Sequence, residues 1–200
     1  MQMDKNMDSK SKGVNFLKSI DILMKEHSNI QKMLEVIRRA CFQIVGGGEI
    51  NHQDFLNIVD FIRNYADKYH HKKEEDMLFV DMGNDLGEPI KNGPIQGMLV
   101  EHDMGRRFVR LLEEAVKEHQ QGKEEAKLDI IANAIGYQTL LADHIEKENT
   151  VLYQMAIRNL KDQTKDKLDR EFQDYEQKKE HQESREKYIA FVEKMQEKYL

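Results

Sequence analysis

Residues 70–79 read HHKKEEDMLF and residues 144–153 read HIEKENTVLY, and these two stretches decide the fold that the sequence predicts. In each stretch a histidine is followed four residues later by a glutamate, and then by a leucine and an aromatic residue at matching offsets. Residues four apart lie on the same face of an α-helix. Each stretch therefore predicts a helix that presents a His/Glu pair on one face. The pairs are His70 with Glu74 and His144 with Glu148.

Two further histidines repeat the same layout. His27 lies in MKEHSNI and His102 in LVEHDMG, and a glutamate precedes each of them. His102 follows His27 by 75 residues (102 minus 27), and His144 follows His70 by 74 (144 minus 70). The sequence therefore predicts two helical hairpins with the same arrangement of polar residues.

Apolar residues recur at spacings of three and four along most of the chain, which is typical of amphipathic helices. Gly46, Gly47 and Gly48 end the first such pattern, and both prolines lie in the stretch MGNDLGEPIKNGP, which we expect to be a loop. Pro94 is suited to the first turn of the third helix. We predict long helices over residues 16–45, 51–81, 94–122 and 124–160.

Short connections between long helices favour antiparallel neighbours. The sequence thus predicts an all-α fold, an up-down-up-down antiparallel four-helix bundle over residues 17–160. Residues 1–16 are polar and lack periodicity, so we expect a disordered arm. Residues 161–200 are highly charged with few apolar positions, and we expect one additional C-terminal helix packed on the bundle.

The composition excludes several classes of protein. The formal charge of −6 and the pI near 5.8 offer no basic surface for nucleic acid. Cys41 is the only cysteine, so no internal disulfide can form and a reducing cytoplasm fits best. The sequence shows neither a signal peptide nor an apolar run long enough for a membrane span, and we expect a soluble cytoplasmic protein.

In an antiparallel bundle the four histidines and two glutamates fall at similar levels along the axis. Buried together without a counter-ion they would be costly, and a metal removes that cost. Imidazole with carboxylate suits iron, manganese or zinc, and two carboxylates can hold two ions close together. The predicted metal ligands are His27, His70, Glu74, His102, His144 and Glu148.

The register of the second helix has an alternative. His71 and Glu75 repeat the spacing of His70 and Glu74 one residue later, and the match of EEDMLF to EKENTVLY favours the earlier pair. The remaining histidines lie near turns or among charged residues, so we expect them to be solvated rather than ligating. They are His52, His119 and His181.

The blocks MKEHSNI, HHKKEEDMLF, PIQGMLVEHDMGRRF and HIEKENTVLY resemble, in this order, those of the hemerythrin family, in particular its bacterial cation-binding proteins with an HHE-type domain. The resemblance covers about residues 18–160. It implies two non-haem iron ions with an oxo or hydroxo bridge, for which zinc or manganese are possible substitutes. It also implies that the six predicted ligands hold the ions, with Glu74 and Glu148 bridging them.

The chain departs from the oxygen-carrying members at Arg106, where they have a second histidine four residues after the first. Two octahedral ions offer about twelve positions, of which about ten would be filled. Two stay open unless Tyr69, Glu101 or another residue closes one. We therefore expect a protein that binds, senses or detoxifies oxygen, nitric oxide or peroxide, with an unidentified redox partner and no membrane or nucleic-acid partner.

Three alternatives to this function stay open. The first is a redox enzyme that decomposes peroxide or reduces nitric oxide, the second is iron storage or handling, and the third is a metal-free helical interaction module. Tyr69 and Tyr137 could line a cavity, although we favour a packing role for both, and Gly105 and Gly136 leave room either for a ligand or for a neighbouring helix.

Overall fold

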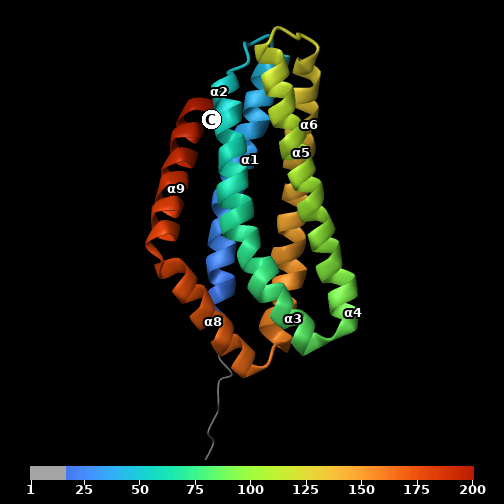
Figure 1. Ribbon diagram of the computed structural model, residues 1–200, viewed down its shortest axis with the longest axis vertical. Helices are drawn as coiled ribbons and strands as arrows, with labels where there is room; N and C mark the ends of the chain where they lie inside the picture. The colour runs from blue at the N-terminus through green and yellow to red at the C-terminus, as the bar shows by residue number, and fades with distance from the viewer. Residues whose placement is uncertain (1–16) are drawn as a thin grey trace, which may run out of the picture.

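The structure, a computed structural model, describes residues 17–200, which form helices joined by short connections with no strand among them (Figure 1). The expected arm over residues 1–16 lies outside the described residues. The first helix, α1 (Lys18–Val45), ends at Gly46, and Gly47 adopts a φ of 89°, which is open to glycine at little cost. The three glycines therefore end this helix where the sequence predicts.

The second long helix is continuous from His52 to Leu86 but becomes π-helical in two places. Two stretches of it are π-helical, with backbone hydrogen bonds from each residue to the fifth one along, which widen the helix. The Asn51 side chain caps its start by accepting a hydrogen bond from the backbone N–H of Asp54. Its parts are α2 (His52–Phe61), η1 (Ile62–His71), η2 (Glu74–Leu78) and α3 (Phe79–Leu86).

The predicted loop over residues 82–94 is wrong, because the chain breaks only at Gly87, whose φ is 84°. Pro89 lies in the first turn of the next helix, where its missing N–H costs nothing. Pro94 lies inside a π-helical segment instead of starting a helix. The third long helix consists of α4 (Glu88–Ile90), η3 (Lys91–Ile95) and α5 (Gln96–Gln120).

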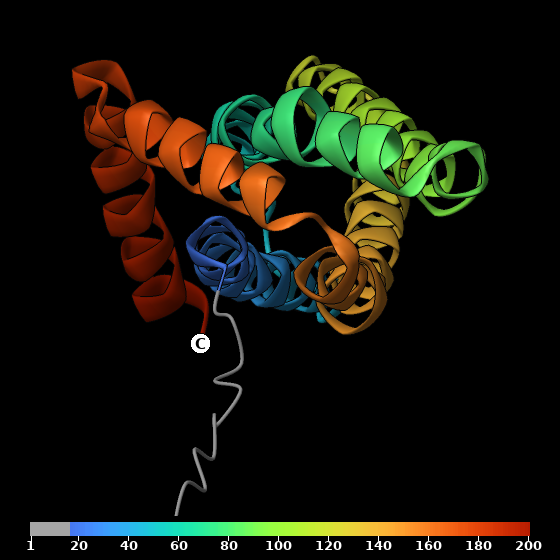
Figure 2. The same cartoon turned by 90° about the horizontal axis from the view of Figure 1, so that it is seen from below.

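The fourth long helix consists of α6 (Ala126–Lys147), η4 (Glu148–Leu152) and α7 (Tyr153–Asn159). Figure 1 shows the α1–α2 and α5–α6 connections at one end of the molecule, and the α3–α4 and α7–α8 connections at the other. Seen from below in Figure 2, the four long helices surround a common interior. The described residues therefore form a helical bundle.

The interior of the bundle has two hydrophobic clusters at different levels. One includes Ile37, Ile58 and Leu112, and the other includes Leu23 and Met82. In each long helix the predicted ligands fall between the residues of these two clusters. The apolar packing thus encloses a polar layer from both ends.

Two helices follow the bundle where a single fifth helix was predicted: α8 (Asp162–Gln177) and α9 (Lys179–Tyr199), separated by a bend at Lys178. The Tyr175 ring stacks on the His181 ring at 3.8 Å across this bend. α8 packs on α1 and η2, and α9 packs on α1 and η1 (Figure 1). Within residues 17–200, none of the helices combines the length and the apolar character needed to cross a lipid bilayer.

Candidate metal centre

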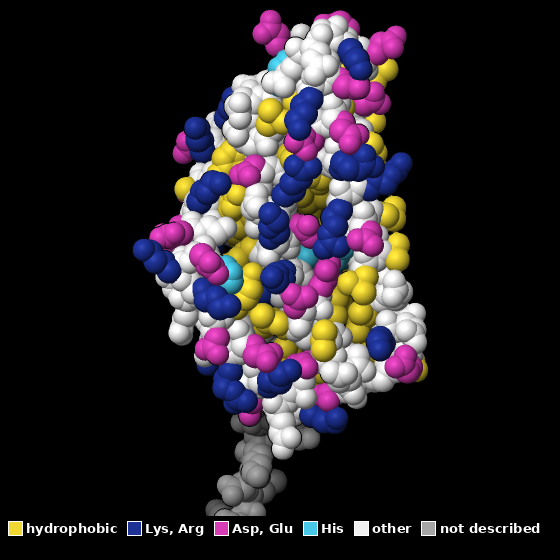
Figure 3. Space-filling model, viewed as in Figure 1, with side chains coloured by type: hydrophobic (Ala, Val, Ile, Leu, Met, Phe, Trp, Pro, Cys, Tyr) yellow, Lys and Arg dark blue, Asp and Glu magenta, His cyan; other side chains and the backbone are white. Residues whose placement is uncertain are grey.

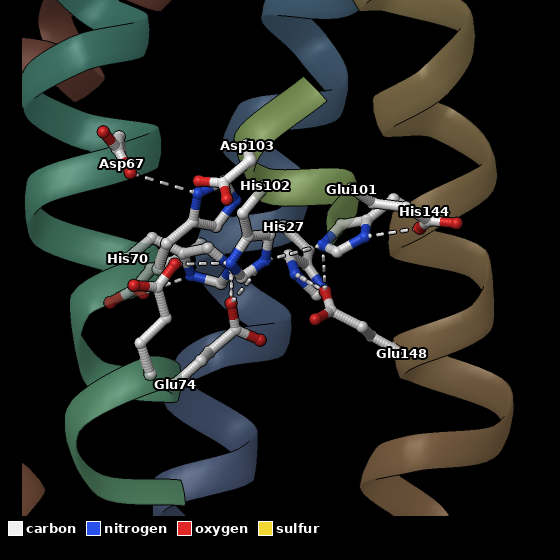
Figure 4. A network of polar contacts seen from close by, with 12 residues as sticks. His27, Asp67, His70, Glu74, Glu101, His102, Asp103, His144 and Glu148 are labelled. Atoms are coloured by element: carbon white, nitrogen blue, oxygen red, sulfur yellow. Dashed lines mark hydrogen bonds and ion pairs between the residues drawn. The ribbon is translucent and has the colours of Figure 1, made fainter. Parts of the chain in front are cut away.

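The six predicted ligands converge in the middle of the bundle, and all of them are buried (Figure 4). They come from all four long helices. One group of side chains that could hold an ion consists of His27, His70, Glu74 and Glu148, whose ligand atoms lie within 4.8 Å of one another. The other includes His102 and His144. That these residues bind metal remains a prediction.

His71 completes the second group, together with His102 and His144. Its ring stacks on that of His102 with the centroids 3.8 Å apart and the planes within 10°. The His70 and His71 rings are both buried at the centre, one in each group, so the choice between them as ligands stays open. On an α-helix, adjacent residues point about 100° apart; the π-helical turn of η1 takes more residues per turn and reduces that angle.

Each of the two interior carboxylates lies between imidazoles from different helices. Oε2 of Glu148 lies 3.2 Å from Nε2 of His27 and 3.3 Å from Nε2 of His144. Oε2 of Glu74 lies 3.5 Å from Nε2 of His70 and 3.8 Å from Nε2 of His102. Both carboxylates are therefore placed to contact two ions.

The other ring nitrogen of these four histidines contacts an oxygen acceptor at 2.7 to 2.9 Å. Because the partner is an oxygen acceptor, Nδ1 carries the proton and donates, and Nε2 keeps its lone pair for the interior. Partners of this kind fix the orientation of an imidazole before any ion arrives. The pairs are His27 with Asn149, His70 with Glu26, His102 with Glu75, and His144 with Glu101.

These outer partners follow the same internal repeat as the predicted ligands. Glu26 binds Lys73, and Glu101, 75 positions later, binds Lys147. Glu26 and Glu101, which precede His27 and His102 in the sequence, therefore indicate this outer layer. Each of them binds the histidine of a neighbouring helix and not the histidine next to it in the sequence. The repeat breaks at His71, because Ile145 occupies the matching position.

Several interior atoms are left without a hydrogen-bond partner among the described residues: Nε2 of His70, Oε2 of Glu74 and both carboxylate oxygens of Glu148. In addition, Nε2 of His102 lies 3.0 Å from Nε2 of His144. Two nitrogens bound to one ion at about 2.1 Å and at a right angle would be about 3 Å apart. The residues present therefore fit a metal site.

The electrostatics of the two carboxylates differ. Burial and the neighbouring Glu148 raise the pKa of Glu74 well above its usual value. Burial also raises the pKa of Glu148, but His144 and His27 outweigh it and hold the pKa low. Two buried carboxylates this close disfavour a second negative charge, which a divalent cation would offset.

Tyr153 adds a hydroxyl on one side of the centre only. It donates a hydrogen bond to Oε1 of Glu74 at 2.5 Å and lies 3.4 Å from Nε2 of His27. Burial and the nearby carboxylates raise the pKa of Tyr153 well above its usual value, so the hydroxyl keeps its proton. Phe79 occupies the matching position of the repeat and has no hydroxyl, so the repeat could not indicate a functional role for Tyr153.

Tyr69 and Glu101, which could have filled an open coordination position, make other contacts. The Tyr69 hydroxyl donates to Glu176 of α8, and Glu101 holds His144 from outside. Arg106, which replaces the expected histidine, is half-exposed and binds Asp67 and Glu75. The fifth imidazole thus comes from the second long helix instead of the third.

The histidines expected to be solvated lie outside this centre, but they are paired. Nε2 of His52 lies 2.7 Å from Nδ1 of His119, close to the α1–α2 and α5–α6 turns. Nδ1 of His181 donates to the backbone carbonyl of Tyr175 at the bend after α8. They therefore serve local contacts in this structure.

The comparisons with known proteins agree with this geometry. The family model described as the hemerythrin HHE cation-binding domain matches residues 18–156. No curated protein and no solved structure matched the chain. The matched residues contain the whole of the centre and leave out α8 and α9. The chain belongs to the hemerythrin family of HHE cation-binding domain proteins.

Proposed function

We propose that this protein holds two non-haem iron ions, joined by an oxo or hydroxo bridge, in the up-down-up-down bundle expected from the sequence. The observation that carries the proposal is that Nε2 of His70, Oε2 of Glu74 and both carboxylate oxygens of Glu148 are buried without a hydrogen-bond partner among the described residues, while an outer oxygen holds Nδ1 of each of the four histidines. When bound, two such irons supply electrons and open coordination positions for a small ligand. We propose oxygen, nitric oxide or peroxide as that ligand.

His71 changes the expected number of open positions. Five imidazoles, two bridging carboxylates and one bridging oxygen would fill about eleven of about twelve positions on two octahedral ions. His71 joins the group with His102 and His144, so the position left open falls beside His27 and His70. The arrangement supports binding of one small ligand on that side.

Tyr153 is placed to act on such a ligand. Its hydroxyl lies beside His27 and carries a proton that it already donates to Glu74. A donor in a dry interior stabilises negative charge that develops on a bound ligand. This favours, as a second candidate, an enzyme that reduces nitric oxide or decomposes peroxide.

The test is the metal content of anaerobically purified protein, with iron, zinc and manganese measured together, and its visible spectrum before and after oxygen, nitric oxide or peroxide. We expect two irons per chain and a spectrum that responds to one of the ligands. The double variant His70→Ala/His144→Ala should lose the iron, and His52→Ala, outside the centre, should retain it. Wild-type protein that binds iron no better than the double variant would rule the proposal out.

A further inference from the structure

A pocket of about 230 Å³ enters the bundle between η1, α5 and α6 and ends at His71 and His102. Its walls include Ile62, Val109 and Leu141. Figure 3 shows a hollow with hydrophobic side chains inside it, between Lys and Arg side chains and close to exposed histidine atoms. The pocket therefore joins the surface to the side of the centre that holds three imidazoles.

Tyr137 lines this pocket, and its hydroxyl has no hydrogen-bond partner within the part of the chain that the structure describes. The side chain is only 3% exposed. A buried hydroxyl without a partner is unfavourable by about 1–3 kcal/mol, so this group is available to a ligand. Burial raises the pKa of Tyr137, and the hydroxyl therefore stays protonated and can donate.

Gly105 creates part of the space. It faces the Tyr137 ring across the α5–α6 contact, and a Cβ placed there would lie 3.6 Å from that ring. A larger side chain at this position would extend into the pocket that Gly105 lines. The absence of a side chain at Gly105 therefore contributes to the volume of the pocket.

Both arginines that line the mouth are paired with carboxylates, whereas the lining Lys68 donates, within the described part of the chain, only to the Asn64 amide oxygen. Arg106 binds Asp67 at 2.7 Å, and Arg63 binds Glu113 at 2.5 Å. Paired charges at a surface give little net attraction for an ion. With its apolar walls and both arginines paired, the pocket is better suited to an uncharged molecule.

We propose that this pocket binds an uncharged, largely apolar organic molecule with one oxygen, which accepts a hydrogen bond from the Tyr137 hydroxyl. An apolar cavity of about 150 Å³ holds benzene, so the larger volume here suits a body of about seven to ten non-hydrogen atoms. Such a molecule lies against His71 and His102. Its binding depends on the pocket walls and goes beyond the proposed function, because it needs no metal.

The experiment measures binding of 4-fluorophenol to the full-length protein by fluorine NMR, with fluorobenzene and 4-fluorobenzoate as comparison probes. We expect 4-fluorophenol to bind most tightly, fluorobenzene on the order of tenfold more weakly because it lacks the oxygen, and the charged 4-fluorobenzoate not at all. The Tyr137→Phe variant, which keeps the ring, should weaken 4-fluorophenol by a similar factor and leave fluorobenzene unchanged.

Gly105→Val fills the pocket and should abolish binding of both neutral probes. Gly97→Val is the matched control, since Gly97 lies on the same helix with open space around it. Circular dichroism checks that each variant is folded. The proposal is overturned if folded wild-type protein binds none of the probes, which would leave water as the content of the pocket, or if Gly105→Val binds as wild type does.

Metal analysis of the same samples separates this proposal from the proposed function. Iron-free protein that binds 4-fluorophenol supports the pocket and contradicts the iron centre. Iron-loaded protein that binds none of the probes contradicts the pocket alone.

Discussion

Nζ of Lys73 lies 2.7 Å from Oε1 of Glu176, and this contact joins the metal-binding bundle to α8. Lys73 is fully buried, and it also binds Glu26, the residue that holds His70. Its ammonium lies 3.9 Å from the centre of the Tyr69 ring. The C-terminal helices, which the family model leaves out, therefore contribute a charge to the outer layer of the centre.

Replacing Lys73 should be strongly destabilising. Lys73→Met leaves the buried Glu26 without its cation, while Glu176 keeps Arg185 at 2.8 Å, so we expect the free energy of unfolding to fall by about 3–5 kcal/mol. Adding Glu26→Gln removes the carboxylate that is left without a cation and should restore at least ~1 kcal/mol. Urea unfolding of the single and double variants measures both values. Additive losses in the double variant would mean that the two side chains do not interact.

The buried Glu26 should make the stability of metal-free protein depend on pH. Burial, partly offset by Lys73, raises the pKa of Glu26 from 4.5 to about 7. Protonation of Glu26 therefore contributes to the free energy of unfolding. This contribution is fully present below pH 4.5 and is lost as the pH rises through about 7.

Glu26→Gln removes this titration. Its stability relative to wild type should increase by more than ~1 kcal/mol between pH 5.5 and 8 in urea unfolding of chelator-treated protein. Glu35→Gln, an exposed position on the same helix, serves as the control and should show no such trend. A constant difference between Glu26→Gln and wild type across this range would contradict the burial of a titrating carboxyl.

Two glycines on the α5–α6 contact should respond differently to the same substitution. A Cβ at Gly136 would lie 2.7 Å from the Phe108 ring, whereas a Cβ at Gly105 would be in ordinary contact with Tyr137. Alanine brings both helices the same gain in helix propensity, about 1 kcal/mol. We therefore expect Gly136→Ala to be less stable than Gly105→Ala by about 1–3 kcal/mol, measured by thermal unfolding. Equal stabilities would mean that Phe108 moves aside without cost.

Cys41 should react slowly with thiol reagents. Burial raises the pKa of its thiol to about 11, and the side chain is 2% exposed. At pH 8 only about one molecule in a thousand then carries the reactive thiolate. Reaction with a disulfide reagent should be at least ~100-fold slower in native protein than in urea, and should speed up about tenfold per pH unit below pH 11. A native rate close to the rate in urea would place this thiol at the surface.

His71 should matter more for metal binding than Arg106. His71→Ala removes an imidazole from the group with His102 and His144, so we expect iron affinity to fall by at least ~tenfold and one iron per chain to be lost first. Arg106→Ala alters only the outer contacts and should keep two irons. Elemental analysis after dialysis measures both. Two irons in both variants would exclude His71 as a ligand.

The sequence predicted those parts of the fold that depend on local signals. Three consecutive glycines after Val45 leave no alternative to a helix end, and the apolar periodicity places the four long helices. The stretch around Gly87 was misread because Gly83 and Pro94 usually end helices. Here both lie within helical segments, since Gly83 packs against Lys91 and Pro94 falls in a π-helical turn.

The centre was predictable as far as it repeats. Residues such as His70 and His144 were identified because each has a counterpart in the other hairpin, and their placement together agrees with that pattern. His71 and Tyr153 break the repeat, so comparing the hairpins could not identify them. No proline or glycine marks the bend at Lys178 in the sequence. The contact between the Tyr175 and His181 rings that accompanies the bend joins two helices, so the helical periodicity could not predict it.

The π-helical turns of the second long helix restrict how the gene can change in length. Deleting one codon between Ile62 and His71 would leave a helix, but it would rotate the residues on one side of the deletion by about 100° relative to the other. The apolar face around Tyr65 and the face that carries His70 could then no longer both point inward. Insertions and deletions are thus tolerable in the connection after Val45 and damaging here, and an alignment with a purely α-helical relative needs a gap inside this helix.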